Sequence, residues 1–191
     1  SSQAARDATL AGLRDPDPLV RLGALDAAAY LAPEERLAAA APLLRGGRRA
    51  VRLAAASALA ELPAPLWTPA ARSALASALA EYRAAQLARA ERPESHLNLG
   101  VLAASFGEWE EARREYETAL RLAPWFVPAL VNLADVERVA GREGEAEALL
   151  RRALALAPED AAVHYALGLA LVRSGRPAEA LPALERAAEL A

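Results

Sequence analysis

Residues 93–126 read PESHLNLGVLAASFGEWEEARREYETALRLAPWF, and residues 127–160 read VPALVNLADVERVAGREGEAEALLRRALALAPED. At a step of 34 residues, these two stretches and residues 161–191 repeat the same residue types in register. The series that keep this step are Gly107, Gly141, Gly175; Ala112, Ala146, Ala180; Ala119, Ala153, Ala187; and Leu99, Leu133, Leu167. A fixed period of this length is the sequence signature of a repeat architecture.

The repeated residue types indicate a pair of helices in each unit. The three glycines lie where one helix must stop and the chain reverse, because glycine adopts the left-handed conformation without a Cβ penalty. Small residues allow two helices to cross closely, and they recur on the first helix as Gly100, Ala134 and Gly168. Pro124 and Pro158 lie between units, where a missing N–H ends a helix at little cost.

This pattern resembles the tetratricopeptide repeat (TPR) family, whose units are antiparallel helix pairs. The resemblance implies three units, at 93–126, 127–160 and 161–191. The large aromatic usual near the start of the first helix is replaced by His96, Leu130 and His164. Pro182 falls inside the last expected helix and would remove the hydrogen bond to the carbonyl of Ala178, so a kink is expected there.

The first half contains a weaker echo. Val20 and Val51, like Arg21 and Arg52, are 31 residues apart, and both pairs follow a turn. The stretch is similar to short HEAT-type repeats, although that class has a longer period of roughly 40 to 47 residues. It predicts helices near 18–31, 34–45 and 48–61, a proline-rich junction, and a helix over 69–91 that couples the two halves.

The predicted fold is therefore all-α, an α-solenoid of antiparallel helix pairs in which HEAT-like repeats precede a TPR superhelix. The expected divisions are HEAT-like repeats at 1–62, a junction and connecting helix at 63–92, and TPR units at 93–191. Composition agrees, because 54% of the 191 residues are hydrophobic and many are alanine, while aromatics are 5%. No uncharged apolar run reaches the roughly 18 residues needed to cross a membrane.

The residue inventory excludes several chemistries. The sequence has no cysteine, and all 22 of its basic residues are arginine, so disulfides, cysteine metal sites, Walker-type phosphate loops and lysine Schiff bases are ruled out. His96 and His164 are two repeats apart, too far to bind one metal ion, and we expect them to pack between helices. We predict no catalytic residue, no metal site and no cofactor in this chain, and hence no enzyme.

Charged clusters have structural explanations. Acidic residues gather at predicted helix starts, where they complement the helix dipole, at Glu108, Glu110, Glu111, Glu159 and Asp160. The densest basic cluster, Arg45, Arg48, Arg49 and Arg52, could contact phosphate or an acidic partner, or could be a solvated helix end. It lacks interleaved aromatics and the chain has a net charge of −3, which argues against nucleic acid. Residues 1–92 carry +3 and residues 93–191 carry −6, which suggests head-to-tail association or steering within an assembly.

The TPR resemblance implies that a protein or peptide ligand lies along the concave face of the first helices. The positions on that face are Leu97, Asn98, Val101, Ser105, Val131, Asn132, Asp135, Arg138, Tyr165, Leu169, Val172 and Arg173. Relatives that grip a chaperone's terminal carboxylate need basic residues where Leu97 and Ala166 stand, so that mode is not expected. The face suits an extended segment or a helix. Its two asparagines could hold a ligand backbone or satisfy neighbouring turns.

Two alternatives concern the setting of the chain. Its second half also resembles the C-terminal repeat region of some bacterial multihaem cytochrome c proteins, which would make it a periplasmic docking tail without haem of its own; otherwise an adaptor in the cytoplasm is expected. The sequence stops at Ala191 without a polar capping helix. We therefore expect a piece of a larger protein, or self-association through the last repeat.

Overall fold

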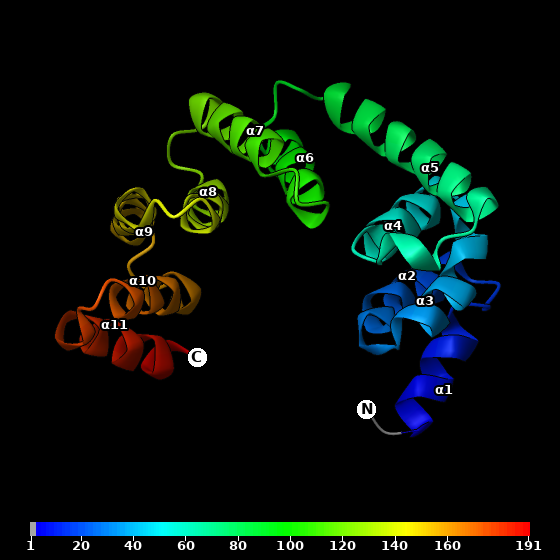
Figure 1. The fold of residues 1–191 in the computed structure, drawn as a ribbon, viewed down its shortest axis with the longest axis horizontal. Helices are drawn as coiled ribbons and strands as arrows, with labels where there is room; N and C mark the ends of the chain where they lie inside the picture. The colour runs from blue at the N-terminus through cyan, green and yellow to red at the C-terminus, as the bar shows by residue number, and fades with distance from the viewer. Residues whose placement is uncertain (1–2) are drawn as a thin grey trace. The chain divides into compact units, whose positions relative to one another are not determined.

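The computed structural model describes residues 3–191, and the chain in that range consists of helices joined by short turns, without a strand (Figure 1). The all-α prediction is confirmed. The contacts divide the chain into two compact units, the first ending at Ala88 and the second beginning at Arg89.

The first unit contains five α-helices and three short 3-10 helices within its described residues. They are α1 (Gln3–Gly12), α2 (Pro18–Ala27), η1 (Ala28–Tyr30), α3 (Pro33–Ala40), η2 (Ala41–Arg45), α4 (Arg49–Ala60), η3 (Ala64–Leu66) and α5 (Pro69–Leu87). Each helix predicted in this half is present, and α1 precedes them. The unit's core includes Leu25, Leu44, Val51 and Leu59.

The 31-residue echo corresponds to a repeated turn. Arg21 donates from Nη1 to the carbonyl oxygen of Asp15 at 2.9 Å, and Arg52 donates from Nη1 to that of Gly46 at 2.8 Å. Both arginines thus tie the start of a helix to the carbonyl six residues earlier. The two valines differ, because Val51 is buried in the core while Val20 is exposed. The HEAT-type assignment stays a prediction.

By its contacts, helix α5 belongs to the first unit, which ends at Ala88. The predicted division into repeats, junction and connecting helix stays a prediction. Thr68 caps α5 as expected, its Oγ1 accepting a hydrogen bond from the N–H of Ala71, and Pro69 follows in the first turn. Leu75 and Leu79 are buried, and α5 packs on α4 and η2. The proline-rich segment is tied down by Trp67, whose Nε1 donates to the carbonyl of Leu62. Rigid coupling of the two halves stays a prediction.

The second unit contains three antiparallel helix pairs that follow one another (Figure 1). The pairs are α6 (Pro93–Ser105) with α7 (Trp109–Leu122), α8 (Val127–Val139) with α9 (Glu143–Leu156), and α10 (Ala161–Arg173) with α11 (Pro177–Leu190). They coincide with the three repeats predicted from the 34-residue period.

The turn within each pair is built the same way. Gly107, Gly141 and Gly175 have φ values of 72°, 75° and 73°, in the left-handed region that favours glycine. The residue after each glycine donates its N–H to a carbonyl five residues earlier, as in Glu108 to Ala103 and Arg142 to Glu137, both at 2.9 Å. This is the Schellman arrangement, and it satisfies carbonyls that the ending helix leaves unpaired.

Close helix crossings account for the small residues. A Cβ added to Gly100 would lie 2.4 Å from a ring carbon of Tyr116, and one added to Gly168 would lie 2.5 Å from Leu184. The last helix is continuous through Pro182. The proline falls within the helix's second turn, so the loss of one hydrogen bond does not end α11.

Candidate functional site

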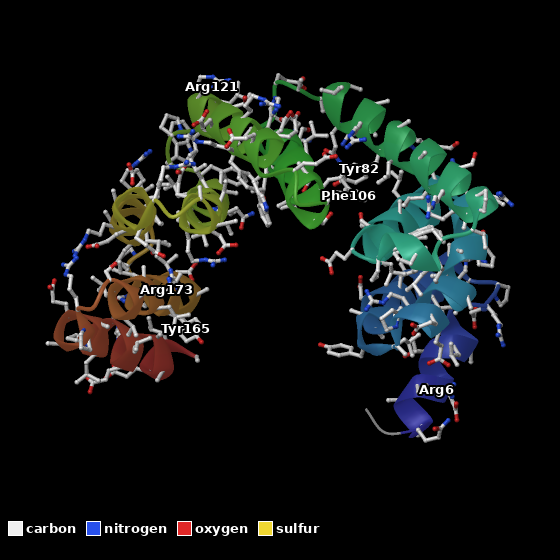
Figure 2. The ribbon with its side chains drawn as sticks, in the orientation of Figure 1. Arg6, Tyr82, Phe106, Arg121, Tyr165 and Arg173 are labelled. Atoms are coloured by element: carbon white, nitrogen blue, oxygen red, sulfur yellow. The ribbon has the colours of Figure 1, made fainter. Side chains whose placement is uncertain are left out.

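The predicted binding face is divided into exposed and inward-facing positions. Val101 on α6 is 47% exposed, and on α10 the values are 55% for Tyr165, 36% for Leu169 and 47% for Val172. Figure 2 shows Tyr165 and Arg173 projecting from α10. The third repeat therefore offers an aromatic and two aliphatic side chains to a ligand, and the first repeat offers one valine.

The middle repeat is polar where its neighbours are apolar. Asp135 occupies the register position of Val101 and Leu169, and it forms an ion pair with Arg138 at 2.7 Å. The hydrogen bond to Asp135 raises the pKa of Arg138 above its ordinary value. The face thus has two apolar ends separated by a charge pair.

Several predicted residues contribute mainly to the interior. Leu97 packs against the cluster around Tyr116, and Val131 against the clusters around Leu150 and Leu130. Asn98 and Asn132 are half-buried. Ser105 donates its hydroxyl hydrogen to the carbonyl of Leu102. Arg173, by contrast, is exposed and pairs with Glu143. Exposure depends on how neighbouring helices cover each position, which the period alone does not give.

One exposed residue of this face was missed. Val139, at the end of α8, is 40% exposed and occupies the register position of Ser105 and Arg173. The 34-residue step could have found it, since 105 plus 34 is 139. Val139 extends the apolar surface into the middle repeat beyond the Asp135–Arg138 pair.

A buried carboxylate joins the first two repeats. The Glu137 side chain is 3% exposed and forms ion pairs with Arg113 of α7, at 2.9 Å, and with Arg142 of the following turn. The register positions in the other repeats are Ala103 and Leu171, both buried and apolar. Nearby, burial and then the charge of Asp135 raise the pKa of Tyr116 to about 12.

The histidines differ in their surroundings. His96 is held between the carboxylate of Glu115 and the carbonyl of Ala90, whereas His164 contacts the carbonyl of Pro158. The acidic residues at helix starts have local roles. Asp160 caps α10 by accepting from two backbone N–H groups, and Glu111 pairs with Arg114. Within residues 3–191 no three histidine or acidic side chains are grouped as metal ligands.

Three of the four arginines of the basic edge contact groups of the first unit. Arg45 donates to the carbonyl of Ala70, and Arg49 and Arg52 both pair with Glu81, at 3.2 and 2.8 Å. The hydrogen bonds from Arg52 hold the pKa of Glu81 below its ordinary value. These contacts favour the structural interpretation of the cluster over a phosphate site.

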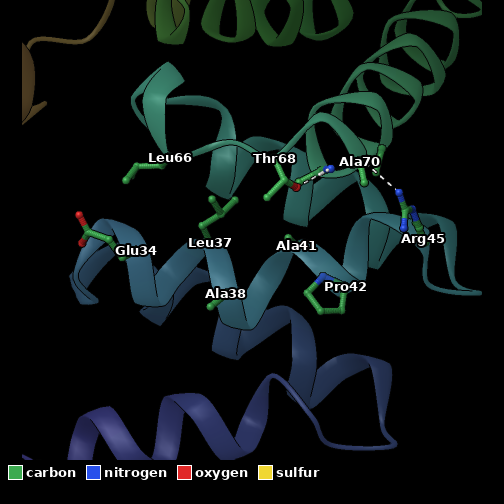
Figure 3. Close-up of a pocket in the computed structure, with 11 residues that line it drawn as sticks. Glu34, Leu37, Ala38, Ala41, Pro42, Arg45, Leu66, Thr68 and Ala70 are labelled. Atoms are coloured by element: carbon green, nitrogen blue, oxygen red, sulfur yellow. Dashed lines mark hydrogen bonds between the residues drawn. The ribbon is translucent and has the colours of Figure 1, made fainter.

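A hollow of about 560 Å³ lies beside Arg45, between α3 with η2 and the start of α5 (Figure 3). Its lining is mainly apolar and includes Leu37, Pro42, Leu66 and Ala74. Separately, no helix among the described residues is both long and apolar enough to cross a membrane.

Comparison with known sequences decides the family. One tetratricopeptide repeat profile matches residues 127–191 and another matches residues 93–124. Residues 93–191 belong to the TPR family. The matched segments are the three helix pairs of the second unit. The curated relatives include the protein O-mannosyl-transferase Tmtc1 of Drosophila melanogaster, which is 35% identical over 103 residues. That match covers 53% of this chain and 12% of the transferase, so the chain spans about an eighth of that relative.

Solved structures extend the comparison to the fold. YrrB, described as a TPR protein with an unusual peptide-binding site, is 31% identical with a TM-score of 0.53, over 57% of this chain and 56% of YrrB. A structure of MamA is 20% identical with a TM-score of 0.53, over 97% of this chain and 96% of MamA. The second likeness shows the fold alone. Together they support an α-solenoid of antiparallel helix pairs.

Proposed function

We propose that the chain is a non-catalytic scaffold that binds a segment of another protein along the face of α6, α8 and α10. The observation that carries the proposal is the exposure of Tyr165, Leu169 and Val172 together on one helix of a TPR unit. Monomeric proteins expose large apolar patches rarely, and such patches mark interaction sites. The likeness to YrrB, described as having a peptide-binding site, supports a peptide ligand.

The distribution of polarity on the face restricts the ligand. Val101 and the α10 patch lie two repeats apart, with the Asp135–Arg138 pair between them. Helix layers are about 8 to 10 Å apart, so the two apolar ends are separated by roughly 20 Å. An extended segment rises about 3.3 Å per residue and would place its apolar anchors about six residues apart. A helix, rising 1.5 Å per residue, would need anchors about thirteen residues apart.

A random peptide display library selected on the full chain tests this proposal. Tyr165→Ala and Leu169→Ala should each weaken binding of the selected peptides about tenfold or more, as truncation of an interface hot spot does. Leu122→Ala is the matched control, because Leu122 is 43% exposed at the end of α7, outside the face. Peptides that lose binding to the Leu122 variant and keep it to the Tyr165 variant would contradict the proposal.

The third repeat favours a second function, assembly of copies of this chain. At one register position, the first and second repeats carry charged residues that pair with the next repeat. Arg113 pairs with Glu137 at 2.9 Å, and Glu147 pairs with Arg176 at 2.8 Å. In the third repeat this position is Leu181, which is 56% exposed. An apolar residue in place of a salt-bridging one suits contact with a second copy.

Light scattering across protein concentration, at low and high salt, tests assembly. Leu181→Glu should abolish a concentration-dependent dimer, and Leu122→Glu should leave it unchanged. Leu184→Glu is unsuitable, because Leu184 packs against Gly168 and its loss would disrupt the repeat itself. A strict monomer at all concentrations would remove this second function and leave peptide binding untouched.

A further inference from the structure

His96 and His164 are fixed in the same way on one ring nitrogen. They are 68 residues apart, two repeat steps, and so are the residues whose carbonyls they contact. Nε2 of His96 lies 2.9 Å from the carbonyl oxygen of Ala90, and Nε2 of His164 lies 2.8 Å from that of Pro158. A carbonyl oxygen can only accept a hydrogen bond, so Nε2 holds a proton in both rings. In each ring Nδ1 is therefore the atom that differs.

The partner of Nδ1 changes from repeat to repeat. His96 Nδ1 lies 2.6 Å from Oε2 of Glu115. Two repeats later, the position of Glu115 is occupied by Ala183, whose methyl group cannot make that contact. Nδ1 of His164 is buried and has no hydrogen-bond partner among the described residues. A buried nitrogen left without a partner is costly.

The middle repeat fills the same place with hydrocarbon. Its equivalent positions are Leu130 and Leu149, which pack together in one core cluster. The position on the second helix is therefore a carboxylate in the first repeat (Glu115), a leucine in the second (Leu149) and an alanine in the third (Ala183). In the first repeat both ring nitrogens of the histidine are bonded, and the partner of Nδ1 is a carboxylate. A carboxylate is therefore the group that complements a histidine at this position.

A hollow of about 260 Å³ lies beside His164, between α9, α10 and α11. Its wall is mainly apolar, with Leu154, Leu167, Leu171, Pro182 and Ala183. This volume is just below the roughly 300 to 1,000 Å³ of pockets for drug-sized ligands, so it suits a smaller group. None of its lining residues belongs to the face proposed to bind peptides.

The charges at the hollow balance. Arg151 of α9 and Glu179 of α11 line it, Arg151 pairing with Glu147 at 2.7 Å and Glu179 with Arg176 at 2.5 Å. An anion entering the hollow thus meets one cation and one carboxylate, both already paired. The specific attraction has to come from His164.

We propose that this hollow binds a carboxylate on a short apolar stem, with one oxygen against Nδ1 of His164 as Glu115 is placed against His96. Because Nδ1 is buried, the atoms that cover it have to shift as the carboxylate enters. The stem contacts Leu154, Leu167 and Leu171. Because Nε2 already holds a proton, the ring must take up a second proton on Nδ1 to donate to the carboxylate. The carboxylate belongs either to a small free acid or to an acidic side chain of a partner protein.

The test is nuclear magnetic resonance of the histidine rings in the full chain, titrated with butyrate and with butyramide as the neutral control. His96→Gln and His164→Gln assign the two sets of ring signals. Butyrate should shift the His164 signals saturably and leave those of His96 unchanged. It should bind about tenfold or more tightly than butyramide, since hydrogen bonds to charged groups are the stronger ones.

Two variants of Ala183 distinguish the effect of supplying a carboxylate from the effect of filling the hollow. Ala183→Glu supplies the carboxylate from the chain, so the His164 signals should move towards those of His96 and the butyrate response should vanish. Ala183→Leu copies the middle repeat and should abolish the response without that movement. Equal responses to butyrate and butyramide, no saturable shift of His164 in the folded chain, or butyrate binding that survives Ala183→Glu would each overturn the proposal.

The source of the carboxylate is distinguished by a capped tripeptide, acetyl-Ala-Glu-Ala-amide, with its Gln counterpart as control. Tighter binding of the Glu peptide than of butyrate assigns the site to an acidic side chain of a partner. Tighter binding of butyrate assigns it to a small acid. Failure of both probes to shift His164 would refute the site, whatever the outcome of the peptide selection on the first-helix face.

Discussion

Replacing Gly100 by alanine places a methyl group where the ring of Tyr116 already lies. The added Cβ would be 2.4, 2.6 and 2.9 Å from three ring carbons, distances that unstrained carbon atoms do not adopt. Tyr116 is 2% exposed and packed among Ala103, Leu133 and Val136, so its ring has little room to move. Either α6 and α7 separate or the ring shifts into its neighbours.

The expected cost combines two opposing effects. Overpacking of a filled core costs about 1 to 3 kcal/mol. Alanine in place of a helix-interior glycine returns about 0.5 to 1 kcal/mol. Gly100→Ala should therefore lower the free energy of unfolding by about 1 kcal/mol, and by up to about 2 kcal/mol if the ring does not move. Gly168→Ala should cost less, because it meets the more flexible and half-buried Leu184.

Chemical denaturation measures this cost, and the chain offers its own control and its own rescue. Gly23 lies inside α2 with nothing within 4 Å of an added Cβ, so Gly23→Ala should stabilise by about 0.5 to 1 kcal/mol. In the second repeat the equivalent pair is Ala134 and Leu150, both buried. The double variant Gly100→Ala/Tyr116→Leu recreates that pair, and the coupling between the two changes should be about 1 to 2 kcal/mol.

A stabilisation by Gly100→Ala equal to that by Gly23→Ala would contradict the predicted clash with Tyr116. Failure of Tyr116→Leu to relieve the cost of Gly100→Ala would contradict it too, because the clash would then not be the cause.

Three further predictions concern the second unit. Glu137→Ala should destabilise by about 1 to 2 kcal/mol by denaturation, less than the 3 to 5 of a fully buried pair, because Arg113 and Arg142 are about one-third exposed and can rehydrate. Glu137→Leu, which copies the third repeat, should cost less than the alanine variant; an equal cost would argue against packing at this position. Gly141→Ala should cost about 1 to 2 kcal/mol from backbone strain alone, since its φ is 75° with open space around it, and Gly141→Asn should cost less. Burial raises the pKa of Tyr116 from an ordinary value near 10 to about 12, so its contribution to stability is complete below pH ~10 and is lost as the pH rises from ~10 towards ~12. Tyr116→Phe should remove that part of the alkaline decline in denaturation midpoint, and an unchanged alkaline profile would contradict the assignment.

The backbone of the second unit could be predicted because its constraints are repeated three times. Gly107 alone is a weak turn signal, whereas three glycines in register predict three left-handed turns, and all three are present. The same holds for the small residues at Gly100 and Gly168. In the first unit the period is shorter and the pattern occurs twice. There the helices were predicted, but the repeat type was not established.

The binding face was predicted less well for a physical reason. The period states which residues are equivalent, but exposure depends on what the neighbouring helices present. Leu97 and Val131 share a register position with Tyr165, yet the first two pack against the core and Tyr165 is exposed. No property of the residue at that position alone distinguishes these cases, because the covering atoms belong to other helices.

The period alone also did not distinguish the surroundings of His164 from those of His96, whereas the contacts within one repeat do. His96, Leu130 and His164 look like one substitution pattern when read along the first helices. Read together with Glu115, Leu149 and Ala183 on the second helices, they become three pairs. These are a histidine–carboxylate contact, an apolar contact, and a histidine without a carboxylate. The pairing of these positions follows from the contact geometry of one repeat and then applies to the others. In a repeat protein, a position where one member of such a pair changes and the other does not is therefore a candidate for a functional role.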